Sequence, residues 1–277
     1  MAALRDALQE PAIAHRKLMC AHAELHAEHM LRAVRAAEAG DDSQEAPATP
    51  EPLSRDEITA KLNSIPTFAM LNADDSMVTM VDDDGGDTCL WFVDPAEASA
   101  TLEAARIANP DVVGLHLGVT PLGLAFAACG GWDGIEEAKD DAQAGGGAKR
   151  FAGELRLQGR QAVVNRMAAS LREQLRAQGL EPGGWQLPVF SCDELQSAGA
   201  MPMFFSHEDL AHAWVLSGRP REEMPDQLNV MDLRLLVNQM RTTDKFPWGS
   251  LQFLCSSAAI ELVQETKAQA QALAAQE

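Results

Sequence analysis

The sequence predicts an α/β (α+β) fold of two pseudo-repeated α/β halves with a mixed sheet, preceded by an N-terminal helix. From Ser54 onward, short apolar, strand-like segments alternate with capped helical segments, and the same order then recurs in the second half. A run rich in Pro, Asp and Ser separates this region from an alanine-rich amphipathic segment. We therefore divide the chain into an N-terminal amphipathic helix (1–38), a tether (39–53), a first α/β half (54–180) and a second α/β half (181–277).

The composition is that of a folded and strongly acidic chain. Of 277 residues, 46% are hydrophobic, which is enough to bury a core. The 41 acidic residues exceed the 22 basic ones and give a formal net charge of -19. A field of this sign repels phosphate backbones and anionic membrane surfaces, so it argues against nucleic-acid binding and against tight docking on such a membrane. It suits a protein that stays dissolved while exposing apolar surface to other proteins.

The N-terminal segment differs in composition from known targeting peptides. Residues 1–39 hold five basic and five acidic residues, with no apolar block followed by a cleavage site. Secretory signals have such a block, and transit peptides are poor in acidic residues. If the protein is imported into an organelle, we expect the numbering to begin at or near the mature form. No apolar run in the sequence approaches the roughly 18 residues that a spanning helix needs.

The elements of the first half follow from its caps and breakers. Ser54-Arg-Asp-Glu57 is a capping box, in which the Ser oxygen and the Glu carboxylate satisfy free amides at a helix start. Pro66 should end that helix at Ser64. The further elements expected, in chain order, are strands at 67–71, 78–81 and 88–93, a helix at 94–109, a strand at 112–119, a helix at 121–129, a strand at 153–158 and a helix at about 161–178.

The second half repeats this order without the 78–87 hairpin or the Gly-rich stretch at 130–148. We expect strands at 187–192, 201–205, 227–231 and 251–255, and helices at 206–217, 232–240 and about 257–275. The offset between matched positions shrinks smoothly along the chain, which indicates an internal duplication with deletions. It is 122, 112 and 97 residues for three matched pairs: Phe68 with Phe190, Asp94 with Ser206, and Leu157 with Leu254.

A stripe of histidines marks one face of the predicted N-terminal helix. At 100° per residue its members fall within about 60° of arc, flanked by Leu and Met residues. The histidines are His15, His22, His26 and His29, and the flanking residues are Leu18, Leu25, Met19 and Met30. The interpretation we favour is a docking face for a protein partner. A metal site and a pigment (chlorophyll) contact are the alternatives, although no Cys or carboxylate on the stripe completes a ligand set.

The sequence nominates no catalytic residue. His116 lies in a predicted strand near Ser99 and Asp111, but no nucleophile elbow or base-orienting pattern accompanies it. His207 is more simply a residue of a helix cap. The acidic stretch at 82–87 lacks the ligand spacing and the final glutamate of a calcium loop. No glycine pair in the chain opens a phosphate-binding fingerprint, so we expect neither a metal nor a cofactor.

The cysteines are dispersed, odd in number and free of any CxxC pattern. They are Cys20, Cys89, Cys129, Cys192 and Cys255. Buried free thiols are the expected state, and one labile disulfide is the alternative.

Two strands are rich in Met and aromatic residues. Their members are Trp91, Phe92, Met201, Met203, Phe204 and Phe205. We expect most of them in the core. Thioethers are flexible and polarizable, so a subset could instead line a groove for a client protein.

The ordered set of motifs resembles the Tic-twenty-two-like (Tic22-like) family over roughly residues 54–265. The motifs are Ile65-Pro66-x-Phe68, the strand ending in Phe92, the strand from Val112 to Val119, Pro121-Leu122-Gly123, Leu187-Pro188-Val189-Phe190 and Pro202-Met203-Phe204-Phe205-Ser206-x-Glu208-Asp209-Leu210. The resemblance implies two halves around a pseudo-twofold axis, with apolar surface grooves and no catalytic residues to carry over. The departures are residues 1–53, the Gly-rich stretch at 130–148 and the absence of tyrosine.

The function implied by this resemblance is the handling of other proteins in a plastid. Members carry preproteins across the space between the envelope membranes, or chaperone outer-membrane proteins in cyanobacterial relatives. We accordingly expect a soluble or peripheral plastid protein in the intermembrane space, the stroma or at the thylakoid surface, without enzymatic activity. The alternative is a structural subunit of a large photosynthetic or envelope complex, anchored by the N-terminal helix.

Overall fold

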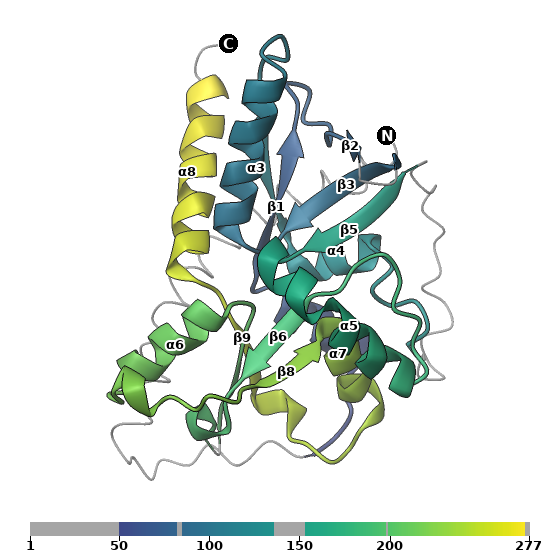
Figure 1. Ribbon diagram of the computed structural model, residues 1–277, viewed down its shortest axis with the longest axis vertical. Helices are drawn as coiled ribbons and strands as arrows, with labels where there is room; N and C mark the ends of the chain where they lie inside the picture. The colour runs from purple at the N-terminus through teal and green to yellow at the C-terminus, as the bar shows by residue number, and fades with distance from the viewer. Residues whose placement is uncertain (1–49, 82–84, 136–152, 198, 275–277) are drawn as a thin grey trace.

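The computed structural model describes residues 50–81, 85–135, 153–197 and 199–274. The predicted N-terminal helix and most of the tether lie outside these residues, as does most of the Gly-rich stretch. Within the described residues the α+β architecture is confirmed: two separate sheets carry helices on their faces (Figure 1).

The first sheet is built around β1 (Pro66–Leu71). Its elements, with the helices between them, are α2 (Arg55–Leu62), β1, β2 (Met80–Val81), β3 (Asp87–Phe92), α3 (Pro95–Ala108), β4 (His116–Pro121), α4 (Leu122–Ala128), β5 (Glu154–Gln158) and α5 (Gln161–Ala177). β1 pairs antiparallel with both β3 and β4, and β5 pairs parallel with β3. The short β2 forms a hairpin with the start of β3. The sheet is therefore mixed, as expected.

The second sheet repeats this plan around β6 (Pro188–Ser191). Its elements are β6, η1 (Asp193–Leu195), β7 (Met201–Phe204), α6 (His207–Leu216), η2 (Arg221–Glu223), β8 (Asn229–Asp232), α7 (Leu233–Thr242), η3 (Trp248–Ser250), β9 (Leu251–Leu254) and α8 (Ser257–Ala274). The strand order is β8-β6-β7-β9. β6 is antiparallel to β7 and β8, while β9 is parallel to β7.

The strand registers confirm the internal repeat. Phe68 pairs with Phe92 and Val119 in the first sheet, as its counterpart Phe190 pairs with Phe204 and Val230 in the second. One predicted match is wrong by a single residue. β5 and β9 pair in parallel with β3 and β7, and this register decides the match. It aligns Leu157 with Phe253, because these residues face Trp91 and Met203, instead of aligning Leu157 with Leu254.

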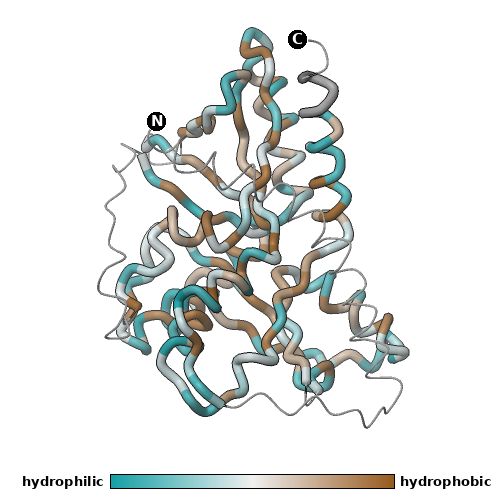
Figure 2. The backbone as a smooth tube through the Cα atoms, turned by 180° about the vertical axis from the view of Figure 1, so that it is seen from behind, coloured by the Kyte–Doolittle hydropathy of each residue, from teal (hydrophilic) through white to brown (hydrophobic). Residues whose placement is uncertain are grey.

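The two sheets exchange their last helices. α5 follows β5 of the first sheet, yet its Val163 and Met167 pack on the Phe190 and Trp214 cluster of the second sheet. α8 follows β9 of the second sheet, yet its Ala259 and Val263 pack beside α3 on the Phe68 cluster of the first (Figure 1). Each sheet is thus covered in part by the helix that follows the last strand of the other sheet. Figure 2 shows hydrophobic and hydrophilic residues alternating along α8, as one core-facing side requires.

A third cluster fills the space between the sheets. α2, α4 and α7 supply fully buried Leu62, Phe126 and Met240 to it. Leu53, just before α2, is also buried, and its amide donates to the Met240 carbonyl at 2.8 Å. Leu53, which the sequence analysis assigned to the end of the tether, is therefore part of this core.

Most predicted helix starts are confirmed, and several strands are shorter than predicted, β2 among them. The capping box at Ser54 and Glu57 is present, with both reciprocal hydrogen bonds. The strand expected at 112–119 begins only at His116. Gly114 has a φ of 79° and packs on Ala73, which turns the chain before the strand starts. Val113, which lies in the predicted strand but outside the observed one, is 79% exposed.

Candidate functional site at the junction of the two halves

A small pocket lies where the two halves meet. Its volume is about 20 Å³, room for about one water molecule. It is lined by Ile65, Pro66, Val93, Asp94, Pro95, Gly159, Phe205, Ser206, Asp209, Leu254, Cys255, Ser256 and Ala259. Several of these residues are repeat partners, for example Asp94 with Ser206 and Gly159 with Cys255. Equivalent positions of the two halves therefore line the pocket, as expected near a pseudo-twofold axis.

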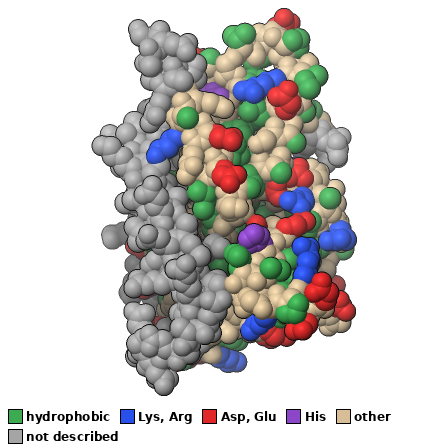
Figure 3. Space-filling model, turned by 90° about the vertical axis from the view of Figure 1, so that its left-hand side faces the viewer, with side chains coloured by type: hydrophobic (Ala, Val, Ile, Leu, Met, Phe, Trp, Pro, Cys, Tyr) green, Lys and Arg blue, Asp and Glu red, His purple; other side chains and the backbone are tan. Residues whose placement is uncertain are grey.

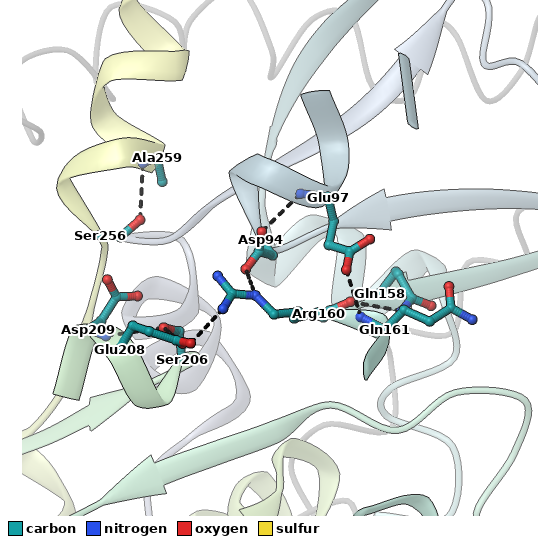
Figure 4. Close-up of polar contacts among 11 residues, drawn as sticks. Asp94, Glu97, Gln158, Arg160, Gln161, Ser206, Glu208, Asp209, Ser256 and Ala259 are labelled. Carbon is teal, nitrogen blue, oxygen red and sulfur yellow. Dashed lines mark hydrogen bonds and ion pairs between the residues drawn. The ribbon is translucent and has the colours of Figure 1, made fainter. Parts of the chain in front are cut away.

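Arg160 ties the two halves together beside this pocket. Its Nε donates to Asp94 Oδ2 at 3.1 Å, and its Nη1 donates to Glu208 Oε1 at 2.7 Å (Figure 4). Asp94 precedes α3 on the first sheet, whereas Glu208 lies in the first turn of α6 on the second. The Asp94 side chain is only 8% exposed, but that of Glu208 is 59% exposed. The Asp94 pair is therefore the better shielded of the two.

We expect Arg160→Ala to lower the free energy of unfolding by about 1–2 kcal/mol, because buried Asp94 loses its charged partner. Glu208→Ala should cost less than about 1 kcal/mol, since that carboxylate stays hydrated. Urea denaturation followed by circular dichroism measures both. A larger loss for Glu208→Ala than for Arg160→Ala would contradict this ranking.

Four helices begin around the junction, and the protein itself caps each of them. Asp94 Oδ1 accepts from the Glu97 amide, and Ser206 Oγ accepts from the Asp209 amide. Ser256 Oγ accepts from the Ala259 amide at the start of α8. The start of α5 is capped by a residue of another helix, because Glu97 Oε1 in α3 accepts from the Gln161 amide. These amides are already bonded, and carboxylates surround them, so the junction does not offer a cradle for an anion.

Burial shifts two titrating groups at the junction. It raises the pKa of the Asp209 carboxyl, with Asp94 and Glu208 adding repulsion, while the Ser206 hydrogen bond and Arg160 act against the shift. Burial also raises the pKa of the Cys255 thiol to about 12, with a further contribution from Asp209. Cys255 is thus a neutral thiol at physiological pH and a poor nucleophile.

Asp209→Asn should stabilise the protein at neutral pH by less than about 1 kcal/mol, because it removes a half-buried charge beside two other carboxylates. The folded-state pKa is raised, so the native state holds this proton at pH values where the unfolded chain has lost it. The wild type therefore loses stability as the pH rises through that pKa. We expect the gain in the variant at about pH 7.5 and its disappearance near pH 4. A gain of equal size at both pH values would contradict the assignment.

His116, the histidine of the first half considered as a catalytic group, has a structural role in the described residues. His116 Nε2 lies 3.0 Å from Asp75 Oδ1 and its Nδ1 lies 3.0 Å from the Gly114 carbonyl, which fastens a turn. Among the described residues there is no group of three or more His, Cys, Asp or Glu side chains placed to hold a metal ion. The four cysteines in this part of the chain are free thiols. None of its helices is long and apolar enough to cross a membrane.

The predicted partner-binding residues divide into two groups. Trp91, Phe92, Met201, Met203 and Phe204 are buried, which is the core position expected for most of this set. Only Phe205 is partly exposed; it lines the junction pocket and stacks on Phe253 at 5.7 Å between ring centroids. The N-terminal stripe, His15, His22, His26, His29, Leu18, Leu25, Met19 and Met30, lies outside the described residues, and its docking, metal and pigment roles stay predictions.

Sequence reasoning missed the Arg160 bridge. Arg160 directly precedes the helix expected at about 161–178, and it is bonded to residues 66 positions before it and 48 after it. The repeat held a signal: the matching position before α8 is Ser256, an ordinary cap. An arginine in place of a cap suggests that the residue has another task.

The sequence matches no protein-family model and no curated protein. Among solved structures, Tic22 from Plasmodium falciparum is similar over 76% of this chain and 98% of its own, with a TM-score of 0.50 and 16% identity. The chain has a Tic22-like fold. Anabaena Tic22, described as a protein-transport protein, aligns over 77% of this chain and 97% of its own, with a TM-score of 0.47 and 14% identity. At this identity the Tic22-like likeness concerns the fold alone.

Proposed function

We propose that this chain is a non-catalytic, Tic22-like plastid protein that binds unfolded polypeptides during protein transport. The observation that carries the proposal is the Tic22-like fold, reached from the sequence motifs and again from the structural similarity to Tic22 of P. falciparum. The surface adds support. Val81, Ile107 and Val113 are each more than 70% exposed on a chain with a net charge of -19. Figure 3 shows hydrophobic side chains at the surface among carboxylates on the side that carries α6 and α8. The net negative charge makes copies of the chain repel one another. Exposed apolar side chains on such a protein suit a role in holding clients without aggregating.

The test is suppression of aggregation. A urea-denatured outer-membrane β-barrel protein is diluted into buffer with and without the full chain, and light scattering is recorded. We expect scattering to fall as the chain is added in stoichiometric amounts, and bovine serum albumin at equal mass serves as the control. Scattering unchanged by the chain, or lowered equally by albumin, would overturn the proposed function.

A truncation distinguishes the proposed function from the alternative, a structural subunit anchored by the N-terminal segment. The shortened chain should begin at Pro50, not Ser54, because Leu53 is buried and its carbonyl accepts from Arg241 Nη1 at 3.1 Å. Under the proposed function the shortened chain still suppresses aggregation. Stable co-purification of the full chain with one large plastid complex, lost on truncation and without client binding, would establish the structural role instead.

A further inference from the structure

The end of α3 and the loop that leads to β4 expose a group of aliphatic side chains. Seven large hydrophobic residues are exposed in the described part of the chain, and three of them lie within this short stretch. Ile107 is 73% exposed, Val112 is 48% exposed and Val113 is 79% exposed. Figure 1 shows the loop beyond the end of α3, at one end of the molecule. We call residues 107–113 the apolar tip.

Hydrogen bonds hold the backbone of the apolar tip in place. The Asn109 amide donates to the Ala105 carbonyl at 3.0 Å, and the Val112 amide donates to the Asn109 carbonyl at 3.0 Å. Arg106 Nη2 donates to the Leu115 carbonyl at 2.7 Å, which ties α3 to the residue before β4. Because the loop is held in one conformation before a partner arrives, binding there costs less conformational entropy.

The turn at residues 72–76 supports the apolar tip from the side. Gly114 packs so closely on this turn that a Cβ at Gly114 would lie 2.8 Å from the Ala73 Cβ. His116 joins the two segments, because its Nδ1 lies 3.0 Å from the Gly114 carbonyl and its Nε2 lies 3.0 Å from Asp75 Oδ1. The loop and the turn thus form one supported surface.

The matching connection of the second half covers its apolar residues. It runs from α6 to β8, is longer than the connection from α3 to β4, and carries Met224 and Leu228, which pack on the Trp214 cluster. Trp214 Nε1 donates to the Pro220 carbonyl at 2.8 Å, which holds this connection against α6. Exposure of aliphatic residues on this connection is therefore not a general consequence of the repeated plan. It is a feature of the first half.

Carboxylates surround the apolar tip. Asp111 lies within it and Asp74 lies in the supporting turn, and both residues are exposed. Within the described residues, no hydrogen bond or ion pair occupies either carboxylate. Arg106, the nearest basic residue in the chain, lies with its Nη1 4.0 Å from Glu103 Oε2. A partner with basic side chains beside an aliphatic segment complements both the exposed valines and the negative charge.

We infer that the apolar tip is a docking site for an aliphatic segment of a client polypeptide that carries basic residues on its flanks. This inference rests on the proposed function and deepens it, because it names the place of contact and the class of segment bound. A second copy of the chain fits this surface less well, since each copy carries a net charge of -19 and the tip itself is acidic.

The first test replaces the exposed valines. The tip variant carries Val112→Ser and Val113→Ser. The control variant carries Val215→Ser and Leu216→Ser, because these side chains at the end of α6 are also about half exposed, at 48% and 45%. The probe is a fluorescein-labelled peptide with a central run of leucine and alanine and with lysines at both ends, titrated with the full chain by fluorescence polarization. We expect the tip variant to weaken binding at least about five-fold and the control variant less than about two-fold. Unchanged urea midpoints show that both variants keep the fold.

The second test changes the charge around the tip. Asp74→Asn with Asp111→Asn should weaken binding of the lysine-flanked peptide at least about three-fold and reduce its dependence on salt. The matched control is Asp226→Asn with Asp244→Asn, which changes the net charge equally at two exposed positions elsewhere. An equal loss in both double variants would mean that the net charge alone selects the peptide, which would overturn the assignment to the tip.

The third test locates the peptide without any variant. The methyl NMR signals of Val112 and Val113 in the full chain should shift as the peptide is added and saturate at the Kd that polarization gives. Shifts at other valines, with these two unchanged, would place the peptide elsewhere and overturn the inference. Sedimentation of the full chain covers the other occupant: a dimer that the tip variant loses would assign this surface to a second copy, against the inference.

The outcomes separate this inference from the function on which it rests. If the wild type suppresses aggregation but the tip variant binds the peptide as the wild type does, the tip is not the site and the proposed function stands. If the control variant weakens binding as strongly as the tip variant, the assignment to the tip is wrong. If the wild type binds neither peptide nor denatured protein, both proposals fail.

Discussion

Phe126→Ala is expected to lower the free energy of unfolding by about 3–5 kcal/mol, among the largest effects for a single substitution in this chain. Phe126 is completely buried in the cluster between the two sheets. Its ring meets Trp132 edge-on at 5.3 Å between centroids and Trp185 at 6.0 Å. The substitution therefore removes apolar contact from both halves and leaves a cavity between segments that cannot easily close on it.

The matched control is Phe246→Ala. Phe246 is 51% exposed and touches Trp248, so the same change of side chain should cost less than about 1 kcal/mol. Chemical denaturation of both variants against the wild type gives the two losses. Equal losses would mean that the cluster between the sheets does not hold the halves together. A biphasic transition only in the Phe126 variant would show that the halves unfold separately once the contact is weakened.

Local signals in the sequence predicted the elements well because their causes lie within a few residues. The Ser54–Glu57 capping box and the caps at Asp94 and Ser206 depend on side chains that reach three residues along the chain. The strand predicted at Val112 and Val113 was wrong because the prediction used local sequence alone. Their β-branched side chains suit a strand, but β1 ends at Leu71 opposite His116, and no strand in the described part of the chain pairs with them.

The arrangement around the junction could not be predicted in this way. That α5 packs on the second sheet depends on Val163 meeting a cluster formed by residues after 189, and local periodicity gives no information about such a contact. The Arg160 pairs are equally distant in sequence. The repeat predicted that the two sheets are alike, and it also made their differences visible, such as the bridging Arg160 before α5 and the helix cap Ser256 at the corresponding position before α8. These differences are where a duplicated fold acquires unequal roles.

Asp232→Ala is expected to lower the free energy of unfolding by about 2–4 kcal/mol, because it leaves buried amides without acceptors. The carboxylate accepts from the Leu187 amide at 3.1 Å and from the Arg234 amide at 2.8 Å, so it joins the start of α7 to the strand β6. Arg234 loses a negative neighbour as well, although it still donates to the Glu181 and Asp133 carbonyls. Asp226→Ala, on an exposed turn, is the control and should change stability by less than about 0.5 kcal/mol.

The cost of Asp232→Ala should depend on pH, and its direction follows from the pKa of the carboxyl. Burial raises this pKa to about 6, against the opposing effect of its amide bonds and Arg234. The unfolded carboxyl titrates near 3.8, so between these values the native state holds a proton that the unfolded chain has released. The wild type therefore gains stability as the pH falls through about 6 and loses it as the pH rises, by at most about 3 kcal/mol. The variant lacks this group, so the difference between the two proteins should be larger at about pH 5 than at about pH 7.5. A difference that grows toward alkaline pH would mean that the amide bonds and Arg234 outweigh burial, and that Asp232 is stabilised as a carboxylate.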